Sequence, residues 1–142
     1  MLTVNSAAGA FPKSSRLLRH ADFQRVYQTG RRQFTGNMTV FFLRRPATDE
    51  DHPSLLRVGL TVGKVLGGAV DRNRIKRRMR AAVRTSWPAP QAPVDVVFNP
   101  RKSVLDLPFA DVAQEVARGL QLAVQRAREA QEGQPAKQVK RK

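Results

Sequence analysis

The sequence predicts an α+β fold, in which a single small domain of about four strands and three helices follows the order αβββαβα. Two long segments near the ends of the chain carry apolar residues at helical spacing. Short apolar or alternating segments typical of strands lie between them. A third helical segment, 72–84, is strongly basic. The length of 142 residues suits one domain with one modest core.

The N-terminal half is expected to supply the first helix and three strands. Residues 17–30 carry apolar side chains at roughly helical spacing and end at Gly30, a common helix stop. Residues 38–45 predict a strand, and so do 55–62, where Val58, Leu60 and Val62 alternate with Gly59 and Thr61. Residues 33–35 predict a short extra strand.

The C-terminal half is expected to supply one strand and one long helix after the basic segment. Residues 94–100, VDVVFNP, form a short apolar strand that Pro100 closes. Residues 108–130 predict a helix with one apolar stripe, formed by Phe109, Val112, Val116, Leu120 and Val124. The domain is therefore expected over 16–130, between disordered tails at 1–15 and, with basic character, at 131–142.

The basic segment predicts an amphipathic helix with Asp71 as its N-cap. Its core-facing side should comprise Ile75, Met79, Ala82, Val83 and Ser86. Seven of the thirteen residues in 72–84 are cations and none is an acid: Arg72, Arg74, Lys76, Arg77, Arg78, Arg80 and Arg84. An ordinary solvated helix face would need acidic partners at i,i+4 to offset this repulsion. The segment therefore predicts a helix that binds a polyanion.

The composition narrows the class of partner. A net charge of +15 indicates nucleic acid or an anionic membrane surface. A membrane surface is less favoured, because the apolar stripe of the basic helix is narrow and only Trp87 could anchor it. The chain has no cysteine, which excludes disulfides and Cys-type zinc sites. Neither a signal peptide nor a membrane span is evident, so a cytoplasmic protein is expected.

Three motifs carry a family resemblance. The segment RNRIKRRMR, preceded by VGLTVGKVLGGAV and far upstream by RLLRHADFQRVYQTGRR, resembles the protein component of bacterial ribonuclease P from about Phe11 to Leu120. The resemblance implies an RNA-binding subunit of a ribonucleoprotein that removes the 5′ leader from precursor tRNA. It implies that the RNA subunit performs the hydrolysis with Mg²⁺, and that the protein has no catalytic residue, cofactor, small-molecule substrate or membrane partner.

The resemblance also implies site residues and one topological feature. Contacts with the catalytic RNA would involve Arg72, Asn73, Arg74, Lys76, Arg77 and Arg80, with Lys64 as a phosphate contact. A cleft for the single-stranded leader would be lined by Phe23, Tyr27 and Phe41. The family has a left-handed βαβ crossover around the basic helix, whereas the general rule would have predicted a right-handed one.

The residues themselves support a leader-binding face. Phe41 and Phe42 are neighbours in a strand and point to opposite faces of the sheet. The short first helix should cover one face incompletely, and an exposed aromatic there could stack unpaired bases. For Phe23, ordinary packing between helix and sheet explains the sequence equally well. The hydroxyl of Tyr27 needs water or a polar partner.

The chain departs from the family pattern after Thr61, where Gly63, Lys64 and Val65 replace Ser-Lys-Lys. Gly68 stands where Asn is frequent, and Arg78 where the family often has an apolar residue. The chain therefore lacks one hydroxyl and one cation that the family pattern has at the end of this strand.

Three other functions compete with this interpretation. An autonomous nuclease is disfavoured, because the acids are scattered apart from Asp49, Glu50 and Asp51, and His20 and His52 are isolated. A structural RNA-binding protein such as a ribosomal protein could share the charge and fold, but would have no use for a stacking cleft. A DNA-binding module would place the basic helix in the major groove, yet no helix-turn-helix partner is evident.

Overall fold

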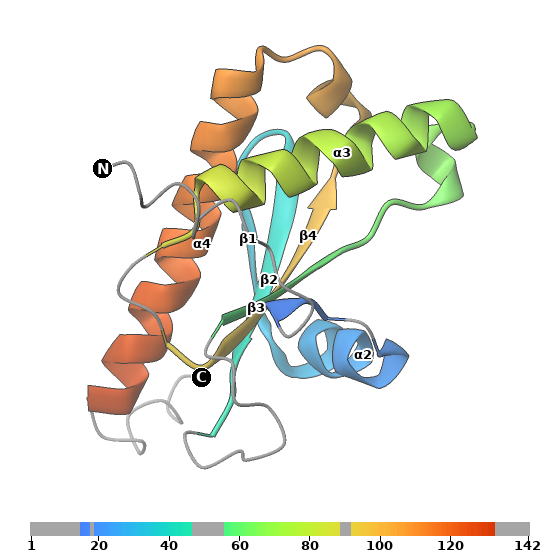
Figure 1. Ribbon diagram of the computed structural model, residues 1–142. Coiled ribbons are helices and arrows are strands. Elements are labelled where there is room, and N and C mark those ends of the chain that lie inside the picture. Colours follow the sequence, from blue (N-terminus) through green and yellow to red (C-terminus); the bar gives the residue numbers. More distant parts are fainter. Residues whose placement is uncertain (1–14, 18, 47–55, 89–91, 133–142) are drawn as a thin grey trace.

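A computed structural model describes residues 15–17, 19–46, 56–88 and 92–132 (Figure 1). The helices are α2 (His20–Thr29), α3 (Ala69–Thr85) and α4 (Phe109–Glu132), and the strands are β1 (Arg31–Phe34), β2 (Met38–Arg44), β3 (Leu56–Leu60) and β4 (Val94–Pro100). Two short 3₁₀ helices are η2 (Lys64–Leu66) and η3 (Lys102–Leu105). The predicted α+β class and the order αβββαβα are confirmed.

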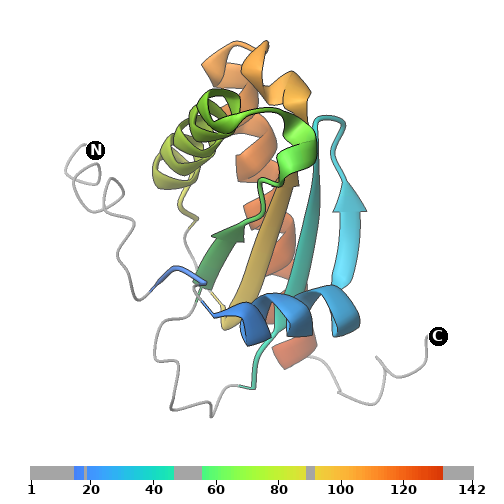
Figure 2. The same ribbon diagram turned by 90° about the vertical axis from the view of Figure 1, so that its right-hand side faces the viewer.

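The four strands form one mixed sheet in the order β1-β2-β4-β3. The pairs β1–β2 and β2–β4 are antiparallel, whereas β3 and β4 are parallel and are joined through α3. This connection is the βαβ crossover, and its left hand stays a prediction. Helices α3 and α4 pack against one face of the sheet, and α2 crosses the other (Figures 1 and 2).

The main core lies between the sheet and the α3–α4 layer. It contains the four apolar residues predicted for the buried side of the basic helix: Ile75, Met79, Ala82 and Val83. The fifth, Ser86, is half-buried, and its hydroxyl donates to the Ala113 carbonyl at 3.1 Å. The α4 stripe is buried from Val112 onward. Phe109 does not belong to the buried stripe, because it begins the helix and remains 38% exposed.

Several element boundaries differ from expectation, among them the short first strand, which spans Arg31–Phe34 instead of 33–35. Asp71 is not the N-cap of α3, which begins at Ala69 after Gly68. Gly67, at φ 126°, allows the chain to turn into the helix earlier, and Asp71 falls in the first turn, where a carboxylate is favoured by the helix dipole. The strand expected over 55–62 ends at Leu60. The predicted tails lie outside the described residues, apart from Ser15 and the last two residues of α4.

Candidate nucleic-acid interface

The strand register arranges side chains in rows on the sheet face that carries α2. One row comprises Arg32, Phe41, Val97 and Gly59. The next row, toward η2, comprises Phe34, Thr39 and Asn99, with Thr61 beside Asn99. Helix α2 crosses the sheet away from η2 (Figure 2), so the second row lies at the less covered end of this face. Its members on the strands are half-buried or exposed.

Three aromatic side chains gather between α2 and this face, namely Phe23, Tyr27 and Phe41, which we call the aromatic cluster. The Tyr27 and Phe41 rings meet edge to face, with centroids 4.9 Å apart. All three are half-buried beside the buried Leu17, Val26 and Val97. The structure thus brings together the three residues expected to line the leader cleft.

The two α2 aromatics are held in different ways. The Phe23 ring lies so close to Gly59 that a Cβ at that glycine would be 2.6 Å from Phe23 Cζ. Phe23 therefore makes the helix–sheet packing that the sequence left as an alternative. The Tyr27 hydroxyl is hydrogen-bonded to Thr61 Oγ1 and donates to Asn99 Oδ1 at 3.0 Å. These polar partners fix the phenol at the boundary between the aromatic cluster and the second row.

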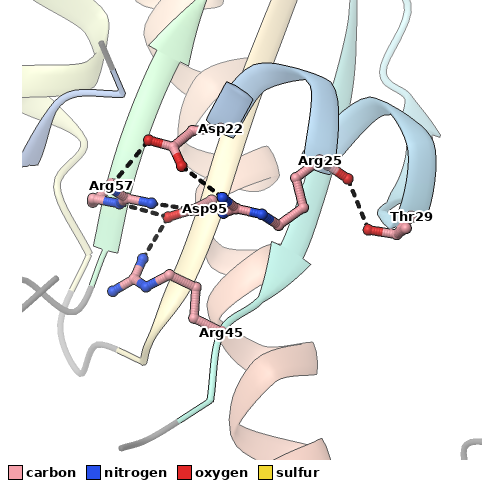
Figure 3. Close-up of polar contacts among 6 residues, drawn as sticks. All are labelled: Asp22, Arg25, Thr29, Arg45, Arg57 and Asp95. Atoms are coloured by element: carbon pink, nitrogen blue, oxygen red, sulfur yellow. Dashed lines mark hydrogen bonds and ion pairs between the residues drawn. The ribbon is translucent and has the colours of Figure 1, made fainter. Parts of the chain in front are cut away.

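A buried ion network anchors the start of α2 to the sheet (Figure 3). Asp95 of β4 is 0% exposed and accepts hydrogen bonds from Arg57 Nε at 2.8 Å and Nη2 at 2.7 Å. Arg45 also donates to Asp95. Arg57 Nη1 lies 3.6 Å from Oδ2 of Asp22, a residue of α2. The other carboxylate oxygen of Asp22, Oδ1, pairs with Arg25 Nη2 at 3.0 Å. The carboxylates offset the cost of burying two guanidinium groups and fix the helix in one position.

Helix α3 presents its cations on the side away from the core. Asn73, Arg74, Arg77 and Arg80 are exposed, whereas Arg72 and Lys76 are half-buried. Lys64 is exposed in η2, just before the helix. We call these seven residues, Lys64 together with Arg72, Asn73, Arg74, Lys76, Arg77 and Arg80 of the helix, the α3 surface.

Two arginines of this helix have structural partners. Arg72 Nε donates to the Gly67 carbonyl at 3.2 Å and so closes the turn that leads into α3. Arg78 Nε donates to the Val104 carbonyl at 3.0 Å, and its Nη2 donates to the Leu107 carbonyl. Arg78 thus ties α3 to the segment after β4.

Sequence reasoning missed the ion network and the partners of Tyr27. The only local signal for the network was a charged residue within each of two apolar strands, Arg57 and Asp95. These two residues are direct partners in the parallel register of β3 and β4, which the sequence does not reveal. Nothing in the sequence around Asn99 indicated that it would bond to Tyr27.

The described residues include no group of three or more His, Cys, Asp or Glu side chains that could hold a metal ion. Among the same residues, no helix is both long and apolar enough to span a membrane.

Sequence comparisons with known proteins identify a family. The family model described as Ribonuclease P matches residues 11–124. The ribonuclease P protein component of Symbiobacterium thermophilum is 38% identical over 73% of this chain and 86% of its own length. That of Limosilactobacillus fermentum is 32% identical over 78% of this chain and 93% of its own length.

Solved structures of ribonuclease P proteins share this fold. The ribonuclease P protein of Staphylococcus aureus superposes with a TM-score of 0.63 at 27% identity, over 78% of this chain and 96% of the other. The Thermotoga maritima protein, at 23% identity and a TM-score of 0.60 over 75% and 96% of the two chains, supports the fold alone. The chain therefore belongs to the ribonuclease P protein family, the protein components of the ribonucleoprotein that matures the 5′ end of tRNA.

Proposed function

We propose that this subunit of ribonuclease P binds the catalytic RNA through the α3 surface and the 5′ leader of precursor tRNA across the α2 face of the sheet. Partnership with the ribonuclease P RNA follows from family membership. The division between the two surfaces is the proposal, and the arrangement of cations and aromatics around one sheet is the observation that carries it.

The α3 surface suits a folded RNA. Its exposed arginines have no acid at i,i+4 within 72–84, so a polyanion would relieve their mutual repulsion. Arginine forms planar, bidentate contacts with phosphate. The apolar side of α3 is buried in the main core, so the basic side meets the RNA on a rigid support. The contacts proposed here are those of Arg72, Asn73, Arg74, Lys76, Arg77, Arg80 and Lys64.

The α2 face suits an unpaired strand. Stacking on aromatic rings tolerates any base sequence, as binding to leaders of varied sequence requires. Phe41 and Tyr27 are half-buried, so each retains some exposed surface. The Tyr27 hydroxyl also bonds to the polar side chains of Thr61 and Asn99. Phe23 supports the cluster mainly through its contact with Gly59.

We assign the hydrolysis itself to the RNA subunit and its Mg²⁺ ions, with no catalytic residue or cofactor supplied by the protein. The acids of the ion network are paired with arginines inside the protein and serve to hold α2. The substrate is thus precursor tRNA and no small molecule. We place the holoenzyme in the cytoplasm, where precursor tRNA is made.

A reconstitution experiment tests this division of labour. The protein is purified after nuclease treatment and assayed for 5′ cleavage of precursor tRNA in Mg²⁺, with and without added catalytic RNA. Cleavage is expected only when the RNA is present, and the protein should lower the precursor concentration needed for half-maximal rate. Cleavage by the nuclease-treated protein alone would overturn the proposal.

A further inference from the structure

We propose that Phe34, with the guanidinium groups of Arg32 and Arg101 over its ring, is a second stacking site for an unpaired leader nucleotide. Phe34 lies at the end of the edge strand β1 and is 57% exposed, the most exposed aromatic side chain among the described residues. This inference rests on the proposed binding of the leader to the α2 face and extends that surface beyond the aromatic cluster.

Phe34 lies on the same face of the sheet as the aromatic cluster. It pairs with Thr39 of β2, and Thr39 is two residues from Phe41 in the same strand. Side chains two apart in a strand point to the same face. Strand geometry separates Phe34 and Phe41 by about 7 Å along the strands and about 5 Å across them, so their Cα atoms are roughly 9 Å apart. Two rings at this spacing would stack on different nucleotides of one strand.

Cations surround the Phe34 ring. The Arg101 Cζ lies 5.6 Å from the ring centroid and the Arg32 Cζ lies 5.9 Å from it, both within cation–π range. Both side chains are exposed and so can also reach phosphates. An exposed aromatic beside guanidinium groups combines a stacking surface with backbone neutralisation, the pairing that single-stranded RNA requires.

The turn that carries Phe34 is fixed from behind. Glu115 of α4 is buried and accepts hydrogen bonds from the Thr35 hydroxyl, the Asn37 backbone N–H at 2.8 Å and Asn37 Nδ2 at 3.0 Å. The Asn37 carbonyl in turn accepts from the Arg101 N–H at 2.9 Å. One turn thus sets the positions of both Phe34 and Arg101, so an incoming base would meet a preformed surface.

The test is a double-mutant cycle between protein and RNA, in which one leader base at a time is replaced by an abasic residue. Binding of each precursor is measured with holoenzyme carrying wild-type protein, F34A or F41L. F34A should bind an intact long leader about five- to tenfold more weakly than wild type does. Binding by the F34A holoenzyme should also no longer depend on the base at one leader position. Binding by the F41L holoenzyme should no longer depend on the base at a different position. Leaderless tRNA should bind all three equally.

Three further variants control for shape and for general surface effects. F34Y keeps the ring and should retain wild-type binding, whereas F34L should resemble F34A. F109A removes another exposed phenylalanine, which begins α4 on the opposite side of the sheet, and should leave the abasic profile unchanged. Urea melts of F34A and F34L should match that of the wild type, because the side chain is mostly exposed.

The outcomes separate this inference from the proposed function. If F41L becomes insensitive to an abasic substitution at one leader position and F34A at none, the second stacking site is refuted, while leader binding on the α2 face stands. If neither variant changes the profile, leader binding on the α2 face fails as well. The second site would also be refuted if F34A lost equal affinity for leaderless and leader-bearing RNA. It would be refuted as well if F34A and F41L became insensitive to the same leader position.

Discussion

Replacing Arg77 and Arg80 by alanine should separate RNA binding from folding in α3. Both side chains are exposed, on the side of the helix opposite the buried Ile75 and Met79. Lys76 and Arg84 lie four residues on either side of Arg80, so the substitution removes like-charge repulsion. Alanine also has the highest helix propensity. The free energy of unfolding should therefore stay constant or rise by a few tenths of a kcal/mol.

The magnitude for RNA binding follows from counterion release. Each lost phosphate contact should reduce the slope of log K against log salt by about 0.7 for single strands and about 0.9 for duplex RNA. Two contacts give a change of about 1.4 to 1.8. If the two arginines contribute to binding only through counterion release, their contribution vanishes near 1 M salt. At 0.1 M salt, one decade lower, the variant should then bind about 25- to 60-fold more weakly than the wild type.

The assay is a titration of catalytic RNA with wild-type and doubly substituted protein over a series of salt concentrations, beside urea melts of both proteins. Arg78→Leu is the matched control, because Arg78 lies in the same helix but donates to the Val104 and Leu107 carbonyls. Its loss should cost about 1 kcal/mol or more of stability and leave the salt slope unchanged. An unaltered slope for the double variant, or the slope change appearing in Arg78→Leu instead, would refute the assignment of the α3 surface.

Three further predictions concern the α2 face. Phe41→Leu keeps most of the apolar volume, so the free energy of unfolding from the urea melt should fall by no more than about 1 kcal/mol. The affinity for leader-bearing precursor should fall by roughly 1–3 kcal/mol, while the affinity for mature tRNA should not change. Equal losses of affinity for the two RNAs would contradict this prediction. Asp95→Asn leaves Arg45 and Arg57 buried without their carboxylate and should cost about 3–5 kcal/mol in the urea melt, and a loss below 1 kcal/mol would count against the network. Gly59→Ala should displace the Phe23 ring and destabilise the protein, and adding Phe23→Leu should restore part of the loss; an additive double variant would argue against the contact.

Apolar periodicity and turn residues were enough to predict the elements of this fold. The buried side of α3 was predicted because Ile75, Met79, Ala82 and Val83 repeat at helical spacing in a segment otherwise made of cations. The N-cap was wrong because Asp71 is a common capping residue, whereas the start of α3 is set by the backbone of Gly67 and Gly68. Phe109 was placed on the apolar stripe of the last helix, but it is the first residue of α4 and remains 38% exposed, which periodicity alone does not show.

The site was only partly predictable, because its contacts depend on strand register. Tyr27 was expected to need a polar partner, but Asn99 lies 72 residues away in the chain and becomes adjacent only through the pairing of β4. Arg57 and Asp95 are 38 residues apart and meet for the same reason. The three aromatics were found through the family resemblance, and Phe34 escaped notice because a single exposed aromatic has no periodic signal.

The 26 Lys and Arg residues of the chain therefore overstate the number of cations available to RNA. Arg45 and Arg57 are 3% and 5% exposed and neutralise Asp95, so they cannot reach a phosphate. Their role is indirect: Arg57 pairs with Asp22 and so fixes α2, whereas Arg45 pairs with Asp95. Helix α2 carries two of the three rings of the aromatic cluster.

The two proposed RNA-binding surfaces are thus held at a fixed separation by one sheet. The α3 surface rests on the main core, and the aromatic cluster is held on the opposite face by buried ion pairs. A leader that emerges from the catalytic RNA would meet a surface already in position, so little ordering entropy is lost on binding. Loosening α2, as in Asp95→Asn, should then weaken leader binding even though Asp95 itself is inaccessible to RNA.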